Sequence, residues 1–130
     1  MKELTKVYEI HATIEKVWQA LTDPSLIKEW LGDKVVMDDT EGTNFELWGG
    51  SIHGTNTKVI KDKELDQDWY SDSDTTWEEP SKVVFTLEDL GESTKVTLTH
   101  TNIPDSEAAS IDSGWDEYYL GAIKEFLEEE

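Results

Sequence analysis

The sequence predicts an α+β fold in which a curved antiparallel sheet of six to seven strands carries its helices on one face. Two observations support this class. Apolar and polar residues alternate near the N-terminus and across residues 33–101, which is typical of strands. Between and after these stretches, apolar residues recur at spacings of three and four, as on the buried face of a helix. The order is one strand, two short helices, six strands and one long helix, as expected for helices packed on one face of an antiparallel sheet.

The first three elements have clear start and stop signals. Residues 4–11 alternate and predict the opening strand. Thr13 is a suitable N-cap for the helix that follows, and Asp23 ends that helix because a residue before proline avoids helical backbone angles. Pro24 suits the first position of a second helix over residues 25–31, and Gly32 suits its end.

The middle of the chain predicts the rest of the sheet. Its turns contain the short polar or glycine-rich segments 41–42, 49–50, 62–63 and 90–92, and we interpret Gly49 and Gly50 as a hairpin turn. The polar segment 71–80 predicts a loop. The strands are expected at residues 34–37, 44–48, 51–61, 64–70, 82–89 and 94–101.

A long amphipathic helix is expected after Pro104. A long helix laid across a curved sheet tends to leave a cavity, so this interface is the candidate functional region. Gly114 is unfavourable inside a helix, so it marks either a late helix start or a close approach to a strand or ligand. The apolar face comprises Trp115, Tyr118, Tyr119, Ala122, Ile123 and Phe126.

Charge and composition exclude several classes of function. The 30 Asp and Glu residues stand against 11 Lys and no Arg, which gives a net charge of −19. Such a field repels nucleic acids and anionic membrane surfaces, so we expect neither as a partner. The absence of Cys excludes disulfides, thiolate catalysis and cysteine-ligated metals.

Length and hydropathy place the chain among small globular domains. Its 130 residues, 36% of them apolar, are enough for one core, and we expect residues 1–130 to form a single domain. No apolar run reaches the length of a signal peptide or a membrane span, so a cytoplasmic location is expected. We predict neither a metal nor another cofactor, and the sequence leaves the oligomeric state open.

Several motifs along the chain, in order and spacing, resemble those of a known family. The chain is similar to the activator of heat-shock chaperone ATPase homologues, in particular their C-terminal domain, within the helix-grip START/Bet v 1-like (SRPBCC) superfamily. The matching pieces are Trp18, residues 21–24, Trp30, residues 45–50, Gly54, Trp69, residues 84–87, 91–96 and 102–104, Gly114, Trp115, Tyr118, Tyr119 and residues 121–124.

The resemblance implies a six- or seven-stranded antiparallel sheet that grips a long C-terminal helix. Members of the superfamily range from hydrophobic-ligand binders and polyketide cyclases to chaperone regulators. The resemblance therefore predicts the fold and leaves several functions open, because one fold hosts many activities.

His100 is the histidine placed best for a functional role. It follows Val96 and Leu98 at a spacing of two, so it shares their face of the strand. In a cavity it would orient a ligand or move a proton. The alternative is a structural histidine that is satisfied by a neighbouring backbone carbonyl near the end of the strand.

A set of aromatic residues is expected to face the cavity together with His100. Such residues line apolar ligand pockets, and they equally form plain hydrophobic cores. Core packing is the better interpretation for Phe85, whereas pocket and core are even for Trp30, Trp69 and Trp115. The candidate ligand-binding residues are Trp30, Phe45, Trp69, Phe85, His100, Trp115, Tyr118 and Tyr119.

The acidic segment 62–79 superficially suggests calcium binding. An EF-hand loop that started at Asp72 would need Gly at position six and Glu at position twelve, where this chain has Trp77 and Val83. A solvated acidic surface is the better interpretation.

Three functional hypotheses follow from these features. The first is a non-catalytic domain whose cavity binds a small lipophilic molecule, with an aromatic or apolar body. The second is a protein-interaction module that acts as a heat-shock chaperone cofactor or stress-response protein. The third is a cyclase/aromatase-like enzyme with His100 as the acid–base group. We assign no catalytic residue and rank the third hypothesis last, because His100 has no visible catalytic partner in the sequence.

Overall fold

The computed structural model describes residues 2–71 and 79–128, so most of the loop expected over residues 71–80 lies outside the described residues. The α+β class is confirmed. The elements are β1 (Lys2–Ile10), α1 (Ile14–Thr22), α2 (Pro24–Leu31), β2 (Asn44–Leu47), a 3₁₀ turn η1 (Trp48–Gly50), β3 (Ile52–Ile60), β4 (Glu64–Ser71), β5 (Ser81–Asp89) and β6 (Thr94–Ile103), then η2 (Asp105–Glu107), α3 (Ala108–Gly114), a π-helical turn η3 (Trp115–Tyr119) and α4 (Leu120–Glu128).

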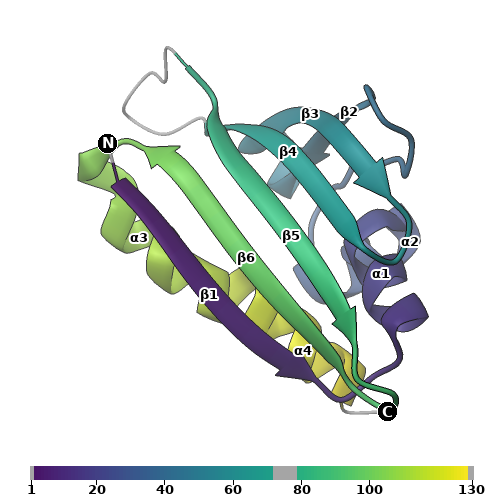
Figure 1. The fold of residues 1–130 in the computed structure, drawn as a ribbon. Coiled ribbons are helices and arrows are strands. Elements are labelled where there is room, and N and C mark those ends of the chain that lie inside the picture. Colours follow the sequence, from purple (N-terminus) through teal and green to yellow (C-terminus); the bar gives the residue numbers. More distant parts are fainter. Residues whose placement is uncertain (1, 72–78, 129–130) are drawn as a thin grey trace.

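The six strands form one antiparallel sheet in the order β1-β6-β5-β4-β3-β2 (Figure 1). Side chains alternate along each strand as expected. On β6, Val96, Leu98 and His100 all face the interior, and on β5, Val83 and Phe85 do the same. The predicted faces of these two strands are therefore confirmed.

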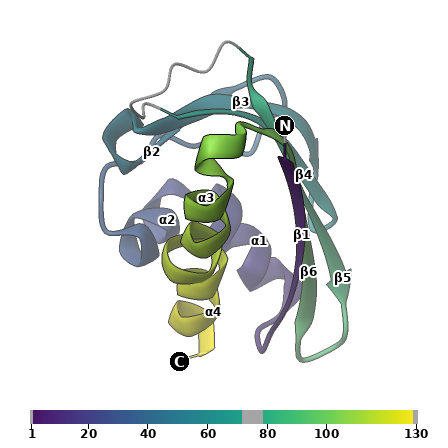
Figure 2. The same ribbon diagram turned by 90° about the vertical axis from the view of Figure 1, so that its left-hand side faces the viewer.

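The helices pack on the concave face of the sheet, and the outer strands bend around them (Figure 2). The C-terminal helical segment runs for 24 residues from Asp105 to Glu128 across this face. The short helices α1 and α2 lie beside it, below β2 and β3 in Figure 2. Gly32 ends α2 in the left-handed region with φ 79°, as predicted.

One local prediction is wrong: residues 34–37 form no strand, because only Val36 pairs, in an isolated bridge with Glu46. Thr13 occupies the N-cap position of α1 as predicted, but its side chain makes no capping hydrogen bond. Gly49 and Gly50 lie in the hairpin turn between the antiparallel strands β2 and β3, as predicted. The turn has a 3₁₀ form, in which Trp48 has a φ of 51°.

The π-helical turn changes the face that the C-terminal helix presents to the sheet. One extra residue in this turn rotates α3 relative to α4, so Trp115, Tyr119 and Leu120 are all buried. Tyr118, expected on the apolar face, is instead 61% exposed. Gly121 permits this turn, since a Cβ atom there would lie 1.7 Å from the backbone oxygen of Asp116. The helix begins before Gly114, so the late start considered for it is wrong.

Candidate functional site

An apolar pocket of about 360 Å³ lies between the C-terminal helix and the end of the sheet formed by β3 and β4. The helix contributes residues from α3 and η3, and the opposite wall comes from η1, β3 and β4. The pocket communicates with solvent, and five of its nine lining residues are aromatic. The lining residues are Trp48, Ile52, Trp69, Ser110, Ile111, Gly114, Trp115, Tyr118 and Tyr119.

Two stacked indole rings form the inner part of this pocket. The ring centroids of Trp69 on β4 and Trp115 on η3 are 4.9 Å apart, with an angle of 26° between the planes. Tyr119 packs against both, with centroid distances of 5.8 and 4.7 Å. The stack joins the sheet to the helix directly, so its geometry sets the width of the pocket.

His100 fixes the indole of Trp115 by a hydrogen bond on the side away from the pocket. Trp115 Nε1 donates to His100 Nδ1 at 3.1 Å, and His100 Nε2 lies 2.9 Å from Ser81 Oγ. Because an indole nitrogen only donates, Nδ1 accepts and the histidine proton lies on Nε2. Burial lowers the pKa of His100 to about 4, so the ring is neutral near pH 7. Ser81 Oγ then donates to the backbone oxygen of Trp69 at 3.4 Å.

A second buried network holds the indole of Trp69. Trp69 Nε1 donates to Gln67 Oε1 at 2.8 Å, and Gln67 Nε2 donates to Asn56 Oδ1 at 2.9 Å. Asn56 Nδ2 continues the network to the backbone oxygen of Asp38 at 3.1 Å and to Thr43 Oγ1 at 3.2 Å. Both indole N–H groups of the stack are thus satisfied by partners away from the pocket, which fixes the orientation of each ring.

The hydroxyl of Tyr119 is an unusual polar group at this site. It has no hydrogen-bond partner among the described residues, although the atom is inaccessible to solvent. Burial raises the pKa of Tyr119, so the phenol is protonated at all ordinary pH values. An unpaired buried hydroxyl carries a desolvation cost.

The pocket-side segment of the helix is tied to the edge strand β1 by charged side chains. Lys6 Nζ lies 2.5 Å from Asp112 Oδ1 and 2.9 Å from Asp116 Oδ2. The hydroxyl of Tyr8 donates to the other carboxylate oxygen of Asp116. These hydrogen bonds lower the pKa of Asp116, so the carboxylate stays ionised and the link persists in mildly acidic solution.

The structure brings half of the predicted site residues together around the pocket. Trp69, Trp115, Tyr118 and Tyr119 line it. His100 is completely buried behind Trp115 and does not line it. The other candidates, Trp30, Phe45 and Phe85, pack against Tyr119 or Trp69 from the core side.

Several residues of the site were not identified from the sequence. Gln67 lies between Leu65 and Trp69 on the inward face of β4, so the alternation alone would have placed it in the interior. Trp48 begins the η1 turn and Ile52 begins β3 just after it, and the backbone conformation of this turn carries no clear sequence signal. Gly114 was singled out as an anomaly, and it lines the pocket.

The described residues 2–71 and 79–128 contain no group of three or more His, Cys, Asp or Glu side chains arranged to hold a metal ion. Within the same residues, no helix is both long and apolar enough to cross a membrane.

The fold and the site define a helix-grip domain of the Bet v 1-like type with an open aromatic pocket beside its C-terminal helix. The chain belongs to the family described as activator of Hsp90 ATPase homolog 1-like protein, whose model matches residues 11–128. The family predicted from the sequence motifs is therefore confirmed.

Individual relatives agree with this membership. The chain is 33% identical over 90 residues to an activator of 90 kDa heat shock protein ATPase homolog from Dictyostelium discoideum, a match that covers 67% of this chain and 23% of the relative. It thus spans about a quarter of that relative's length.

Solved structures extend the likeness over nearly the whole chain. A crystal structure of an HSP90 activator from Plasmodium falciparum superimposes with a TM-score of 0.90 at 24% identity, covering 98% of this chain and 97% of that one. The solution structure of the Aha1 dimer from Colwellia psychrerythraea gives a TM-score of 0.82 at 25% identity, covering 98% and 97%.

Proposed function

We propose that this protein binds a small, mainly apolar or aromatic molecule in the pocket beside the C-terminal helix and performs no chemistry on it. The observation that carries the proposal is an open pocket of about 360 Å³ whose lining is mostly aromatic. Ligand pockets of proteins are typically concave, apolar and of this size, with a few polar groups that orient the ligand.

The hydrogen-bond networks behind the pocket support this proposal. A plain core needs only close packing, whereas here Gln67 and His100 fix the two indole rings that line an open space. Rings held in advance lose little conformational freedom when a ligand binds, so more of the contact energy contributes to affinity.

The contacts of His100 support a positioning role rather than proton transfer. Both of its ring nitrogens are engaged by Trp115 and Ser81, and neither reaches the pocket. Its pKa of about 4 leaves the ring neutral and weakly basic near pH 7. A general acid–base group needs a pKa near the working pH and contact with the substrate, so the cyclase-like hypothesis receives no support from this residue.

A pocket-filling variant tests the proposal. A side chain added at Gly114 meets no atom within 4 Å at its Cβ position, so Gly114→Leu is expected to fill the pocket without disturbing the core. Binding would be followed in an NMR titration with a panel of lipophilic compounds, through the indole N–H signals of Trp48, Trp69 and Trp115. We expect these signals to shift in the parent protein and to stay unchanged in Gly114→Leu.

Ser113→Leu is the matched control, because Ser113 is exposed on the same helix and does not line the pocket. It should bind like the parent protein. Equal binding by Gly114→Leu and Ser113→Leu would place the ligand elsewhere, and the absence of any shift in the parent protein would refute the proposal.

Family membership favours a second candidate function, that of a protein-interaction module acting on a heat-shock chaperone. Relatives of this chain carry the names of HSP90 activators. With a net charge of −19, binding to a chaperone should depend on a basic surface and weaken as salt rises. The test is binding to the 90 kDa heat-shock chaperone of the same organism at low salt, together with its ATPase rate; no association would reject this function.

A further inference from the structure

We propose that the pocket selects a lipophilic organic cation, such as a quaternary ammonium group on an apolar or aromatic body, over neutral and anionic molecules of the same shape. This inference rests on the proposed function, because it specifies the ligand of the same pocket. Three independent features of the described residues carry it: the orientation of the indoles, the chemistry of the lining, and the charge of the surrounding surface.

The orientation of the two stacked indoles disfavours a negative ligand. The hydrogen-bond donor of an indole is its N–H group. Gln67 and His100 take up the N–H groups of Trp69 and Trp115 on the side away from the pocket. These two rings therefore have no N–H group left to donate to a bound anion.

The remaining lining adds aromatic rings and no cationic side chain. Trp48 and Tyr118 stand at the outer part of the pocket, and Tyr118 is 61% exposed. Among the described residues, no Lys or His lines the pocket, and its polar side-chain groups are three hydroxyls and the indole N–H group of Trp48. A carboxylate or sulfonate would lose its hydration here without gaining a charged partner, which is costly.

The surface around the pocket attracts cations. The part of the helical segment that lines the pocket, residues 110–119, carries Asp112, Asp116 and Glu117 and no Lys, and Lys6 of β1 pairs with the first two. The whole chain has a net charge of −19. The resulting field raises the local concentration of cations at the pocket entrance.

The open form of the pocket makes the desolvation of such a ligand tolerable. A cationic head that lies beside Trp48 and Tyr118 at the outer part stays partly hydrated, while its apolar body reaches Trp69 and Trp115. Cation–π contacts then act together with apolar burial, as in the aromatic sites that bind quaternary ammonium groups.

Three isosteric probes test the charge preference: 4-hydroxyphenyltrimethylammonium, 4-tert-butylphenol and 4-hydroxybenzenesulfonate. At mildly acidic pH, where the phenols are protonated, the probes differ in charge and hardly in shape. We expect the cation to bind about 10-fold more tightly than the neutral probe, and the anion to bind most weakly. Affinities would be measured by NMR titration of the Trp indole signals.

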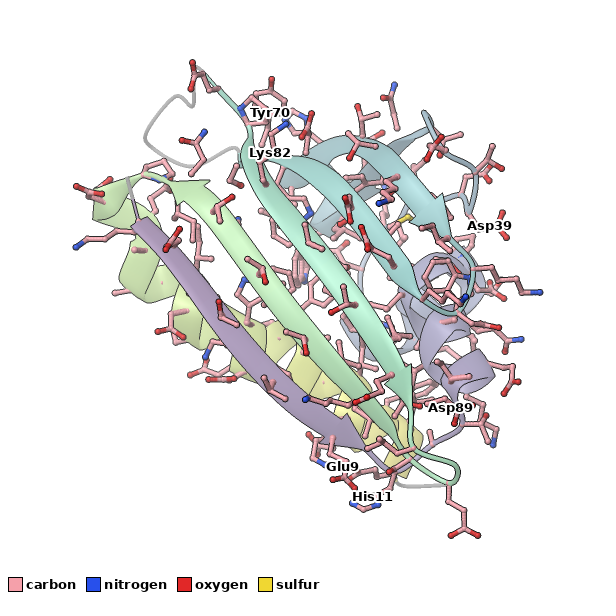
Figure 3. All side chains as sticks on the ribbon, in the orientation of Figure 1. Glu9, His11, Asp39, Tyr70, Lys82 and Asp89 are labelled. Carbon is pink, nitrogen blue, oxygen red and sulfur yellow. The ribbon has the colours of Figure 1, made fainter. Side chains whose placement is uncertain are left out.

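High salt and two variants separate direct contact from the general field. At 1 M NaCl the Debye length is about 3 Å, so a preference that comes only from distant charges disappears, whereas a cation–π preference survives. Tyr118→Leu should lower the affinity for the cation about 3-fold more than the affinity for the neutral probe. Tyr70→Leu is the control, since Tyr70 stacks on His53 and does not line this pocket. Tyr70 is labelled in Figure 3.

Each outcome decides between the proposals. Tighter binding of the neutral probe, equal binding of the two, or a preference lost at 1 M NaCl would overturn the cation inference and leave the ligand-binding function standing. No binding of any of the three probes would overturn the inference and count against the function as well.

Discussion

The C-terminal helix packs against the sheet in two different ways along its length. At the α4 end, Leu120, Ile123 and Leu127 are buried among apolar side chains of α1, α2 and the sheet. At the α3 end, the stacked Trp69 and Trp115 are backed by buried polar networks and face an open pocket. The first end is a filled core, and the second is a pocket that opens to solvent.

This contrast shows that one helix combines two kinds of packing. Filled apolar packing supplies most of the folding free energy, so α4 anchors the helix. Hydrogen-bond networks add less stability but fix orientation, because each partner must lie at one distance and angle. The π-helical turn separates the two ends and allows each to present its own face to the sheet.

The largest expected effect tests whether the filled end anchors the fold. Ile123→Ala removes a fully buried side chain and should lower the free energy of unfolding by about 3 to 4 kcal/mol. Ile111→Ala on the same helix removes a half-buried side chain beside the pocket and should cost about 1 kcal/mol. Urea denaturation of both variants measures the difference, and equal losses would contradict the contrast between the two ends.

A pH titration tests the polar backing of the pocket end. Burial lowers the pKa of His100 from 6.5 to about 4, so below pH 6.5 the unfolded chain binds a proton that the folded protein excludes. Stability from this residue is therefore complete above pH 6.5 and falls by about 3 kcal/mol as the pH drops to 4. Burial and Glu64 raise the pKa of Asp66 to about 6. The contribution of Asp66 to the unfolding free energy therefore decreases as the pH rises, opposite to that of His100.

The variant His100→Gln isolates the histidine contribution, since glutamine can accept and donate hydrogen bonds without titrating. The difference in unfolding free energy between parent and variant should decrease as the pH falls through this range. The ring signals of His100 should also show no titration near pH 6.5 in NMR spectra. A normal histidine titration would mean that the ring is solvated and does not hold Trp115.

A pair of glycine variants tests the turn that separates the two ends. Gly121→Ala places a Cβ atom 1.7 Å from the backbone oxygen of Asp116 and should cost about 2 kcal/mol, because the π-helical turn must rearrange. Gly114→Ala meets nothing within 4 Å and should stabilise the helix by about 0.5 to 1 kcal/mol. Thermal unfolding followed by circular dichroism measures both. Effects of the same sign would show that the π-helical turn has no structural importance.

The smallest expected effect concerns charge. Lys6→Met removes the ion pairs with Asp112 and Asp116 at the pocket end, and Lys124→Met removes the pair with Glu128 at the filled end. Each should cost about 0.5 kcal/mol at low salt, because exposed ion pairs contribute little. Both losses should vanish at high salt in urea denaturation. A much larger loss for Lys6→Met would mean that charge, rather than packing, distinguishes the two ends.

Much of the fold could be predicted from local patterns. The alternation of Val96, Leu98 and His100 correctly placed all three on the inner face of β6, and Pro24 and Gly32 marked the bounds of α2. Residues 34–37 failed as a strand because alternation indicates an extended chain without showing that a partner strand is available. The bridge from Val36 to Glu46 is all that pairs there.

The candidate site was less predictable. Regular helical spacing placed Tyr118 on the apolar face, and the π-helical turn, which spacing does not signal, turned it outward. Three aromatic side chains of the sheet point inward, those of Phe45, Phe85 and Trp69. Of these three, only Trp69 lines the pocket.

The sequence by itself determined the class of fold, the family, the face on which most strand residues lie and the strongly negative charge. These depend on backbone geometry within a few residues and on composition, both of which are local or additive. Only the tertiary structure decided where the interface is filled and where it stays open, and which buried polar group meets each indole. Those outcomes depend on the distance and angle between the helix and the sheet, which are set by all the packed side chains together.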